Sequence, residues 1–183
     1  MPCFAFRLPA FARRALAVRR DSRGAAMMEF GFVAAPLIAL LIAIFQTSLV
    51  FFSQQGLQTT AEDTARLIFT GQAQQQGMTA AQFKTAACTK LPPFLACSKL
   101  MVDVRKASTF AAIDTTVPTI TYDANGNPTN SLAYNLGGAG EIVILRLMYL
   151  WPVGTGPLGL NIANSGTANR LLIATTVSKT EPY

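Results

Sequence analysis

Residues 19–52 read RRDSRGAAMMEFGFVAAPLIALLIAIFQTSLVFF, a basic segment that runs directly into a long apolar one. In the 28 residues from Ala25 to Phe52, Glu29 is the only charged residue. A helix of this length reaches about 42 Å, whereas the hydrocarbon core of a bilayer is only ~30 Å thick. The sequence therefore predicts a transmembrane helix over residues 25–52, which anchors the chain near its N-terminus.

The charges on the two sides of this helix predict its orientation. Residues 1–24 contain six arginines and one aspartate, and no basic residue follows the helix before Arg66. Positive residues that flank a membrane helix are retained on the cytoplasmic side. We therefore expect a single-pass protein with a cytoplasmic N-terminus and a C-terminal domain across the inner membrane, in the periplasm of a Gram-negative bacterium.

Residues 19–52 also allow two simpler interpretations, a cleaved secretory signal and an uncleaved signal anchor. A cleaved secretory signal has an apolar region of about 7–15 residues and a small-x-small cleavage site, and neither is present here. An uncleaved signal anchor fits the span and the charges but does not account for Glu29. A carboxylate inside a span costs about 2.5–3.5 kcal/mol at the centre and less near an edge. Glu29 is thus either a tolerated interfacial acid or a group with a charged partner.

The junction between the two segments carries a resemblance to a known family. Gly24 ends the basic leader, Glu29 follows five residues later, and an apolar helix comes next, so the region resembles a prepilin class III signal. More closely, residues 20–70 resemble TadE-like pseudopilins of the tight-adherence (Flp, type IVc) pilus. The further residues that carry this likeness are Pro36, the segment QQGLQ at 54–58, the segment AEDTAR at 61–66 and, more weakly, the tail KTEPY at 179–183. Met27, Met28 and Gly31 depart from the usual family pattern.

The resemblance implies a processing step and a set of partners. A prepilin peptidase, an aspartic protease of the membrane, would remove residues 1–24 by cleaving between Gly24 and Ala25. Glu29 would then be able to pair with the new Ala25 ammonium of a neighbouring subunit. The implied function is that of a minor pseudopilin, a structural or assembly component of the pilus or of a related secretion machine. Its partners would be the peptidase, other pilin-like subunits, pilus assembly proteins and inner-membrane lipid, and assembly into a pilus would place it outside the cell. The alternative is a signal-anchored periplasmic interaction module that is not cleaved.

The remainder of the chain predicts an α+β fold in which the long helix continues into a small antiparallel-sheet domain. Residues 53–71 form the helical extension, with a stripe of small or apolar residues that would pack either on the soluble domain or on another subunit. Residues 72–183 form the periplasmic domain, which begins with a helix capped by Thr79 and ended by Pro92 and Pro93. The predicted strands are Lys99–Lys106, Val117–Tyr122, Glu141–Trp151 and Arg170–Lys179.

Cys88 and Cys97 are the only cysteines after the predicted leader. Because the predicted topology puts both in an oxidising compartment, we expect a disulfide between them. Closing a loop of this size stabilises a protein by about 2–4 kcal/mol. A metal site is the competing interpretation, but the chain has no histidine and would need further ligands. Cys3 would leave with the leader.

Composition argues against several other functions. Most of the net charge of +6 belongs to the leader, because its removal leaves nine basic and eight acidic residues of the original 15 and 9, with no basic cluster to follow a phosphate backbone. Asn125 and Gly126 predict a hairpin turn rather than a calcium loop, because Pro128 and Tyr134 occupy the decisive ligand-loop positions. No nucleophile motif or carboxylate pair is suited to catalysis. We therefore expect no enzymatic activity, no cofactor, no metal and no nucleic-acid partner.

Overall fold

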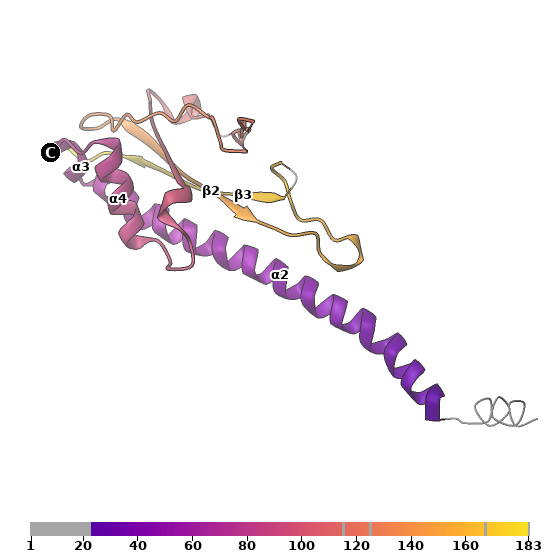
Figure 1. Cartoon of the computed structure of the whole chain (residues 1–183). Helices are drawn as coiled ribbons and strands as arrows, with labels where there is room; N and C mark the ends of the chain where they lie inside the picture. Colours follow the sequence, from indigo (N-terminus) through magenta and orange to yellow (C-terminus); the bar gives the residue numbers. More distant parts are fainter. Residues whose placement is uncertain (1–22, 115, 125, 167, 183) are drawn as a thin grey trace, which may run out of the picture.

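The computed structural model describes residues 23–114, 116–124, 126–166 and 168–182. Its dominant element is helix α2 (Arg23–Phe69), whose C-terminal half packs against a small sheet while its N-terminal half extends away from it (Figure 1). The 47 residues reach about 70 Å and run without interruption through Pro36. By length and composition α2 is able to span a membrane. Of the predicted leader, residues 1–22 lie outside the described part of the chain.

Two short helices follow α2. Gly71, with a left-handed φ of 73°, lies just beyond the long helix, at the predicted end of the helical extension, and the short helix α3 (Gln72–Gln75) follows it. Helix α4 (Ala80–Lys90) has the predicted N-cap, because the Thr79 hydroxyl accepts the backbone N–H of Gln82 at 3.3 Å. The side chain of Gln82 accepts the backbone N–H of Thr79 in return, which completes a capping box.

Three antiparallel strands form the sheet, in the order β1-β2-β3. They are β1 (Leu100–Ala107), β2 (Ile142–Pro152) and β3 (Asn169–Lys179), close to three of the predicted strands. Single 3₁₀ turns lie in the connections, namely η1 (Cys97–Lys99), η2 (Phe110–Ala112) and η3 (Pro157–Gly159). The predicted α+β class is confirmed.

The fourth predicted strand, Val117–Tyr122, is wrong. Within this segment only Tyr122 pairs, as an isolated bridge to Pro128, and Ile120 is buried. The two residues are joined through a turn in which the N–H of Gly126 donates to the carbonyl of Asp123 at 3.0 Å, so a turn lies where one was predicted, although Asn125 is outside the described residues. Val117 is 73% exposed, so the apolar composition of 117–122 leads neither to a strand ladder nor to a continuous buried face.

A different segment extends the sheet edge. The N–H of Val104 donates to the carbonyl of Ala133 at 2.8 Å, and the N–H of Asn135 donates to the carbonyl of Val104 at 2.9 Å. The residue between them, Tyr134, stacks obliquely on Phe83 at 5.8 Å, and its hydroxyl donates to the carbonyl of Met78. Burial raises the pKa of Tyr134 to about 12. The long β1–β2 connection thus joins the sheet edge to α4.

The hydrophobic core lies between the C-terminal half of α2 and one face of the sheet. Leu57, Ala61, Ala65 and Ile68, the predicted stripe, are each at most 5% exposed. They contact the soluble domain, which decides between the two packing partners that the sequence left open. The other core residues on α2 and the strands include Val50, Leu100, Val104, Val143, Leu145, Leu147, Tyr149, Leu172 and Ala174.

Candidate functional site

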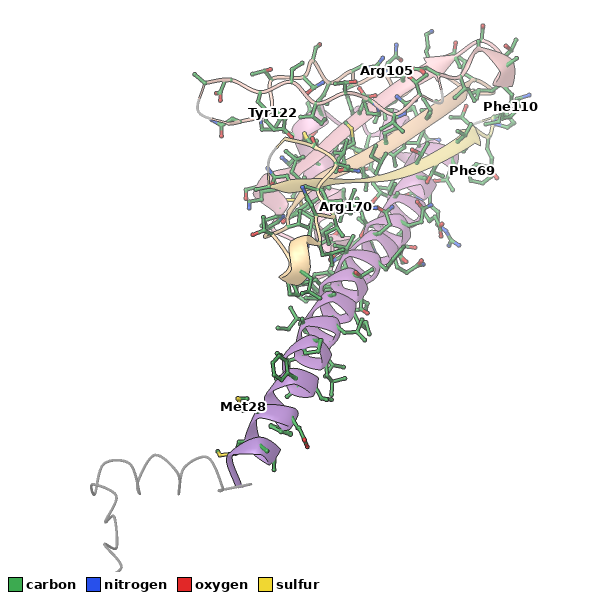
Figure 2. The ribbon with its side chains drawn as sticks, turned by 90° about the vertical axis from the view of Figure 1, so that its right-hand side faces the viewer. Met28, Phe69, Arg105, Phe110, Tyr122 and Arg170 are labelled. Atoms are coloured by element: carbon green, nitrogen blue, oxygen red, sulfur yellow. A yellow bond between two sulfur atoms is a disulfide. The ribbon has the colours of Figure 1, made fainter. Side chains whose placement is uncertain are left out.

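The N-terminal half of α2 exposes apolar side chains around its circumference. None of the most apolar 18-residue window is buried within the chain. A helix that is apolar on all sides is stable when a membrane or other helices surround it. Figure 2 shows this half projecting from the domain, with Met28 near its free end and Phe69 at the opposite end of the helix. The large exposed side chains are Met27, Met28, Phe30, Phe32, Val33, Leu37, Ile38, Leu40, Leu41, Ile42, Ile44, Phe45 and Leu49.

Gly24 and Ala25, the predicted cleavage junction, lie in the first turn of α2 and are exposed. A Cβ added at Gly24 would meet no atom within 4 Å, and the φ of Gly24 is not in the left-handed region. Packing within the described chain therefore gives no reason for a glycine at this position.

Glu29, the predicted assembly residue, is exposed one turn after Ala25. Within the part of the chain that the structure describes, no hydrogen bond or ion pair to Glu29 is found. Ala25 and Glu29 lie four residues apart, on neighbouring positions of one helix face. The structure thus brings the predicted junction and the predicted carboxylate to the same exposed end of α2, away from the sheet.

Polar residues in the middle of α2 are satisfied by the helix itself. The hydroxyls of Thr47 and Ser48 donate to the carbonyls four residues earlier, each at 2.8 Å. Such bonds let a hydroxyl lie in an apolar segment without an unpaired donor. Gln46 differs, because its buried Oε1 has no hydrogen-bond partner in the described residues. After Glu29, polar side chains therefore reappear on α2 at Gln46, before the predicted boundary at residue 52.

The C-terminal half of α2 is fixed to the domain by close contacts as well as by its apolar stripe. The side-chain amide of Gln54 donates to the carbonyl of Ile173 in β3 at 2.8 Å. Thr60 donates to the carbonyl of Lys90 at 3.2 Å, and a Cβ on Gly56 would lie 2.7 Å from Cγ of Pro92. The α4–β1 connection therefore lies directly on α2.

The predicted disulfide joins Cys88 in α4 to Cys97 at the start of η1. It closes the connection that contacts α2, and the N–H of Ala96 in the same connection donates to the Tyr149 hydroxyl at 3.1 Å. Phe94, at the centre of the loop, stacks on Phe52 with ring centroids 5.1 Å apart. Both phenyl rings remain exposed, so they form an apolar surface beside the helix rather than part of the core.

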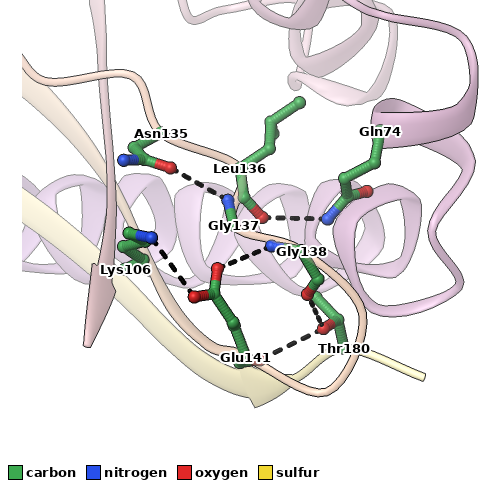
Figure 3. Close-up of polar contacts among 8 residues, drawn as sticks. All are labelled: Gln74, Lys106, Asn135, Leu136, Gly137, Gly138, Glu141 and Thr180. Atoms are coloured by element: carbon green, nitrogen blue, oxygen red, sulfur yellow. Dashed lines mark hydrogen bonds and ion pairs between the residues drawn. The ribbon is translucent and has the colours of Figure 1, made fainter. Parts of the chain in front are cut away.

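A polar junction that sequence reasoning missed joins the turn at 135–141 to Lys106 in β1 and to Thr180 (Figure 3). The Glu141 carboxylate accepts the N–H of Gly138 at 2.7 Å and pairs with the Lys106 ammonium at 3.2 Å. First the Gly138 N–H and then the Lys106 ammonium hold the pKa of Glu141 below its usual value. The Thr180 hydroxyl donates to the Gly138 carbonyl at 2.5 Å.

Backbone pairing extends this junction to α2. The N–H of Glu181 donates to the carbonyl of Phe69, the last residue of the helix, at 2.9 Å. Gln74 in α3 donates to the carbonyl of Leu136 at 2.9 Å. The only sequence signal for this region was the tail at 179–183, and the structure gives that tail a place against the end of the long helix.

A second polar group lies on the sheet face that points away from α2. Asp103 is 2% exposed and accepts from Nε of Arg105 and from the N–H of Ala133, each at 2.8 Å. Arg146, its partner across the strands, is 4% exposed and lies 3.9 Å from the carboxylate of Asp114. The Thr116 hydroxyl and N–H hold the pKa of Asp114 below its usual range. These bonds fix the β1–β2 connection over the outer face.

Comparison with known proteins concerns the helix described above. Residues 24–66 match the family model of TadE-like protein. The N-terminal helix of this chain is TadE-like. The TadE-like segment begins at Gly24, includes Ala25 and Glu29, and ends within α2, so the sheet domain lies outside the match. No curated protein and no solved structure matches the chain.

Proposed function

We propose that this protein is a membrane-anchored pseudopilin, a structural or assembly component of a tight-adherence pilus or a related secretion machine. The observation that carries the proposal is the coincidence of the TadE-like segment with an exposed half-helix that opens with Gly24 and Ala25 and is apolar up to Phe45 except at Glu29. In this proposal α2 crosses the inner membrane, the N-terminus is cytoplasmic and the sheet domain is periplasmic. The protein then acts by assembly with pilin-like subunits and not by catalysis.

The first step of the proposed function is removal of residues 1–24 by a prepilin peptidase. The exposure of Gly24 and Ala25 supports this step, because a protease must reach the bond between them. The open space around Gly24 supports it as well, since no contact within the described chain requires the glycine.

The second step is pairing of Glu29 with the Ala25 ammonium of a neighbouring subunit. An acid within an apolar segment is costly unless it finds a partner, and Glu29 has none in the described chain. Cleavage creates a positive charge at the same exposed end of the helix. The pair would then favour one axial register between adjacent helices, as buried ion pairs do in some assemblies.

The processing step is tested by intact mass and N-terminal sequencing of membrane-extracted protein, produced with and without a prepilin peptidase. We expect a start at Ala25 that depends on the peptidase and is lost in Gly24→Arg. Ser22→Arg is the matched control, because it adds the same charge two residues earlier and should still be cleaved. A chain that begins at Met1 in every sample would favour the uncleaved, signal-anchored interaction module.

The pairing step is tested by photo-crosslinking between subunits from the exposed position of Phe45. Glu29→Gln should reduce crosslinking, whereas Glu62→Gln, the same change on the exposed polar face of α2, should not. The effect of Glu29→Gln should disappear in the Gly24→Arg background, because the uncleaved chain lacks the Ala25 ammonium. Equal effects in cleaved and uncleaved chains would leave Glu29 as an interfacial acid.

A further inference from the structure

The β2–β3 connection extends beyond the sheet and lies along the middle of α2. Figures 1 and 2 both show this loop projecting toward the N-terminal half of the helix. At its end, Leu160 lines a shallow hollow together with Ala43, Ile44, Thr47, Ser48 and Phe51 of α2. The soluble domain therefore contacts the helix well inside the predicted span of 25–52.

Gly156 fixes the loop at this position. A Cβ on Gly156 would lie 2.9 Å from Oε1 of Gln46 and 2.9 Å from the carbonyl oxygen of Leu160, so only glycine fits. The N–H of Gly156 donates to the same Leu160 carbonyl at 2.8 Å, which closes the tip of the loop. The local conformation of the loop therefore holds Gly156 against Gln46 of α2.

This contact limits how much of α2 lies in hydrocarbon. Irregular backbone that faces lipid is not tolerated in the hydrocarbon region, because its polar groups would be unsatisfied. Residues from Ala25 to Phe45 reach about 31 Å as a helix, which already matches the ~30 Å hydrocarbon core. Gln46, Thr47 and Ser48 follow immediately and are polar. The loop beside them then lies at the membrane surface.

The tip of the loop is unusually apolar and exposed. Leu158 is 86% exposed, the highest value among the large hydrophobic residues that the structure describes. It is also the one non-glycine residue in the described chain with a positive φ, 57°. Strained residues of this kind gather at functional sites. The whole segment 153–169 contains no charged residue, so an ionic partner is not favoured.

A second exposed apolar group lies at the same end of the domain. Phe94 and Phe52 are 42% and 61% exposed and stack on each other one turn beyond Ser48. Aromatic side chains are enriched where a membrane helix leaves the hydrocarbon core. Two separate loops of the domain therefore present apolar side chains near the level at which α2 becomes polar.

We propose that the β2–β3 loop inserts Leu158 into the lipid interface beside residues 46–52 of α2 and thereby holds the sheet domain against the bilayer. The proposal rests on the membrane anchoring in the proposed function. It names lipid as the occupant of this surface because the loop lies alongside the end of the membrane span and is apolar and uncharged.

The test places tryptophan at three positions of the full chain, reconstituted in vesicles of phosphatidylethanolamine and phosphatidylglycerol. Part of the lipid carries bromine on the acyl chains near the headgroup, which quenches nearby tryptophan. The variants are Leu158→Trp, the anchor control Leu41→Trp and the domain control Phe110→Trp. Phe110 is the matched control because it too is an exposed apolar residue of a 3₁₀ turn, and Figure 2 shows it toward the same end of the molecule as Phe69, far from Met28. The parent chain, with Trp151 alone, supplies the background.

We expect bromine to quench the added fluorescence of Leu158→Trp and Leu41→Trp and to leave that of Phe110→Trp unchanged. Quenching of Leu41→Trp without Leu158→Trp would overturn the loop insertion while leaving the anchor intact. Absence of quenching in Leu41→Trp would overturn the anchor, and the loop proposal with it. A blue shift of Leu158→Trp emission without quenching would place a second copy of the chain over the loop and would also overturn the proposal.

Discussion

The two halves of α2 share one continuous helix but bury their side chains differently. Up to Leu49 the apolar residues surround the helix and remain exposed, whereas from Val50 onward a single stripe is buried and Glu62, Asp63 and Arg66 occupy the exposed side. Secondary structure does not change between the halves, but hydrophobic periodicity does. The period of the apolar pattern, and not helicity, therefore marks where the intramolecular core begins.

The largest expected effect separates a buried leucine from an exposed one on this helix. Leu57→Ala should lower the free energy of unfolding by about 2–5 kcal/mol, because Leu57 is fully buried against the sheet and its loss leaves a cavity. Leu41→Ala removes the same atoms from a side chain that is 56% exposed and should change stability by less than about 0.5 kcal/mol. Denaturant unfolding in detergent, followed by the fluorescence of Trp151, measures both. Similar losses for both variants would remove the distinction between the halves.

Two glycines of α2 offer a second comparison, because their replacement by alanine should change the free energy of unfolding in opposite directions. Gly56→Ala places a Cβ 2.7 Å from Pro92 and should destabilise the domain by about 1–3 kcal/mol. Gly31→Ala meets no atom within 4 Å and should not destabilise it, since alanine favours a helix by about 0.5–1 kcal/mol over glycine. The same unfolding assay applies. If Gly31→Ala lowered the yield of crosslinking between subunits without lowering the free energy of unfolding, this half of α2 would pack on a partner.

The smallest expected effect concerns pH and the polar junction at the end of the C-terminal half. The pKa of Glu141 is lower in the folded chain than its usual value of 4.5, so its contribution is complete above that value and is lost as the pH falls through the lowered pKa. Glu141→Gln should therefore reduce the decrease in the free energy of unfolding as the pH falls, whereas Glu62→Gln should not. Because the Glu141 side chain is 41% exposed, solvent screening keeps the effect small. Unfolding midpoints between pH 3 and 7, taken at about one-unit steps, measure the slope.

Local sequence signals predicted the helices and strands that have a strong hydrophobic pattern or a capping residue close by in the sequence. The 28-residue apolar run predicted the first part of α2, Thr79 predicted the cap of α4, and strands β1, β2 and β3 appear within a residue or two of their predicted bounds. The Gly24, Ala25 and Glu29 cluster was predicted from its resemblance, and the TadE-like match confirms the family likeness but not the role of these residues.

Long-range contacts were not predictable in the same way. Val117–Tyr122 has the composition of a strand, but only Tyr122 pairs, through an isolated bridge, and only Ile120 is buried, so tertiary context overrides propensity there. The position of the β2–β3 loop beside α2 depends on Gly156, because a Cβ there would lie too close to the side chain of Gln46. Residues 46 and 156 are far apart in the sequence, so this contact could not be predicted without the fold. The Glu141 junction joins residues from four separate segments, and no spacing in the sequence connects them.

The pairing of Glu181 with Phe69 has a mechanical consequence. Glu181 is bonded to the end of α2 that lies farthest from Gly24, and the packed stripe runs from Val50 to Ile68, about 27 Å along the helix axis. A pull on the N-terminal end of α2 therefore acts along this interface in shear, so that all its contacts share the load at once. The domain would resist extraction of its helix as a unit and would yield in one step rather than peel turn by turn.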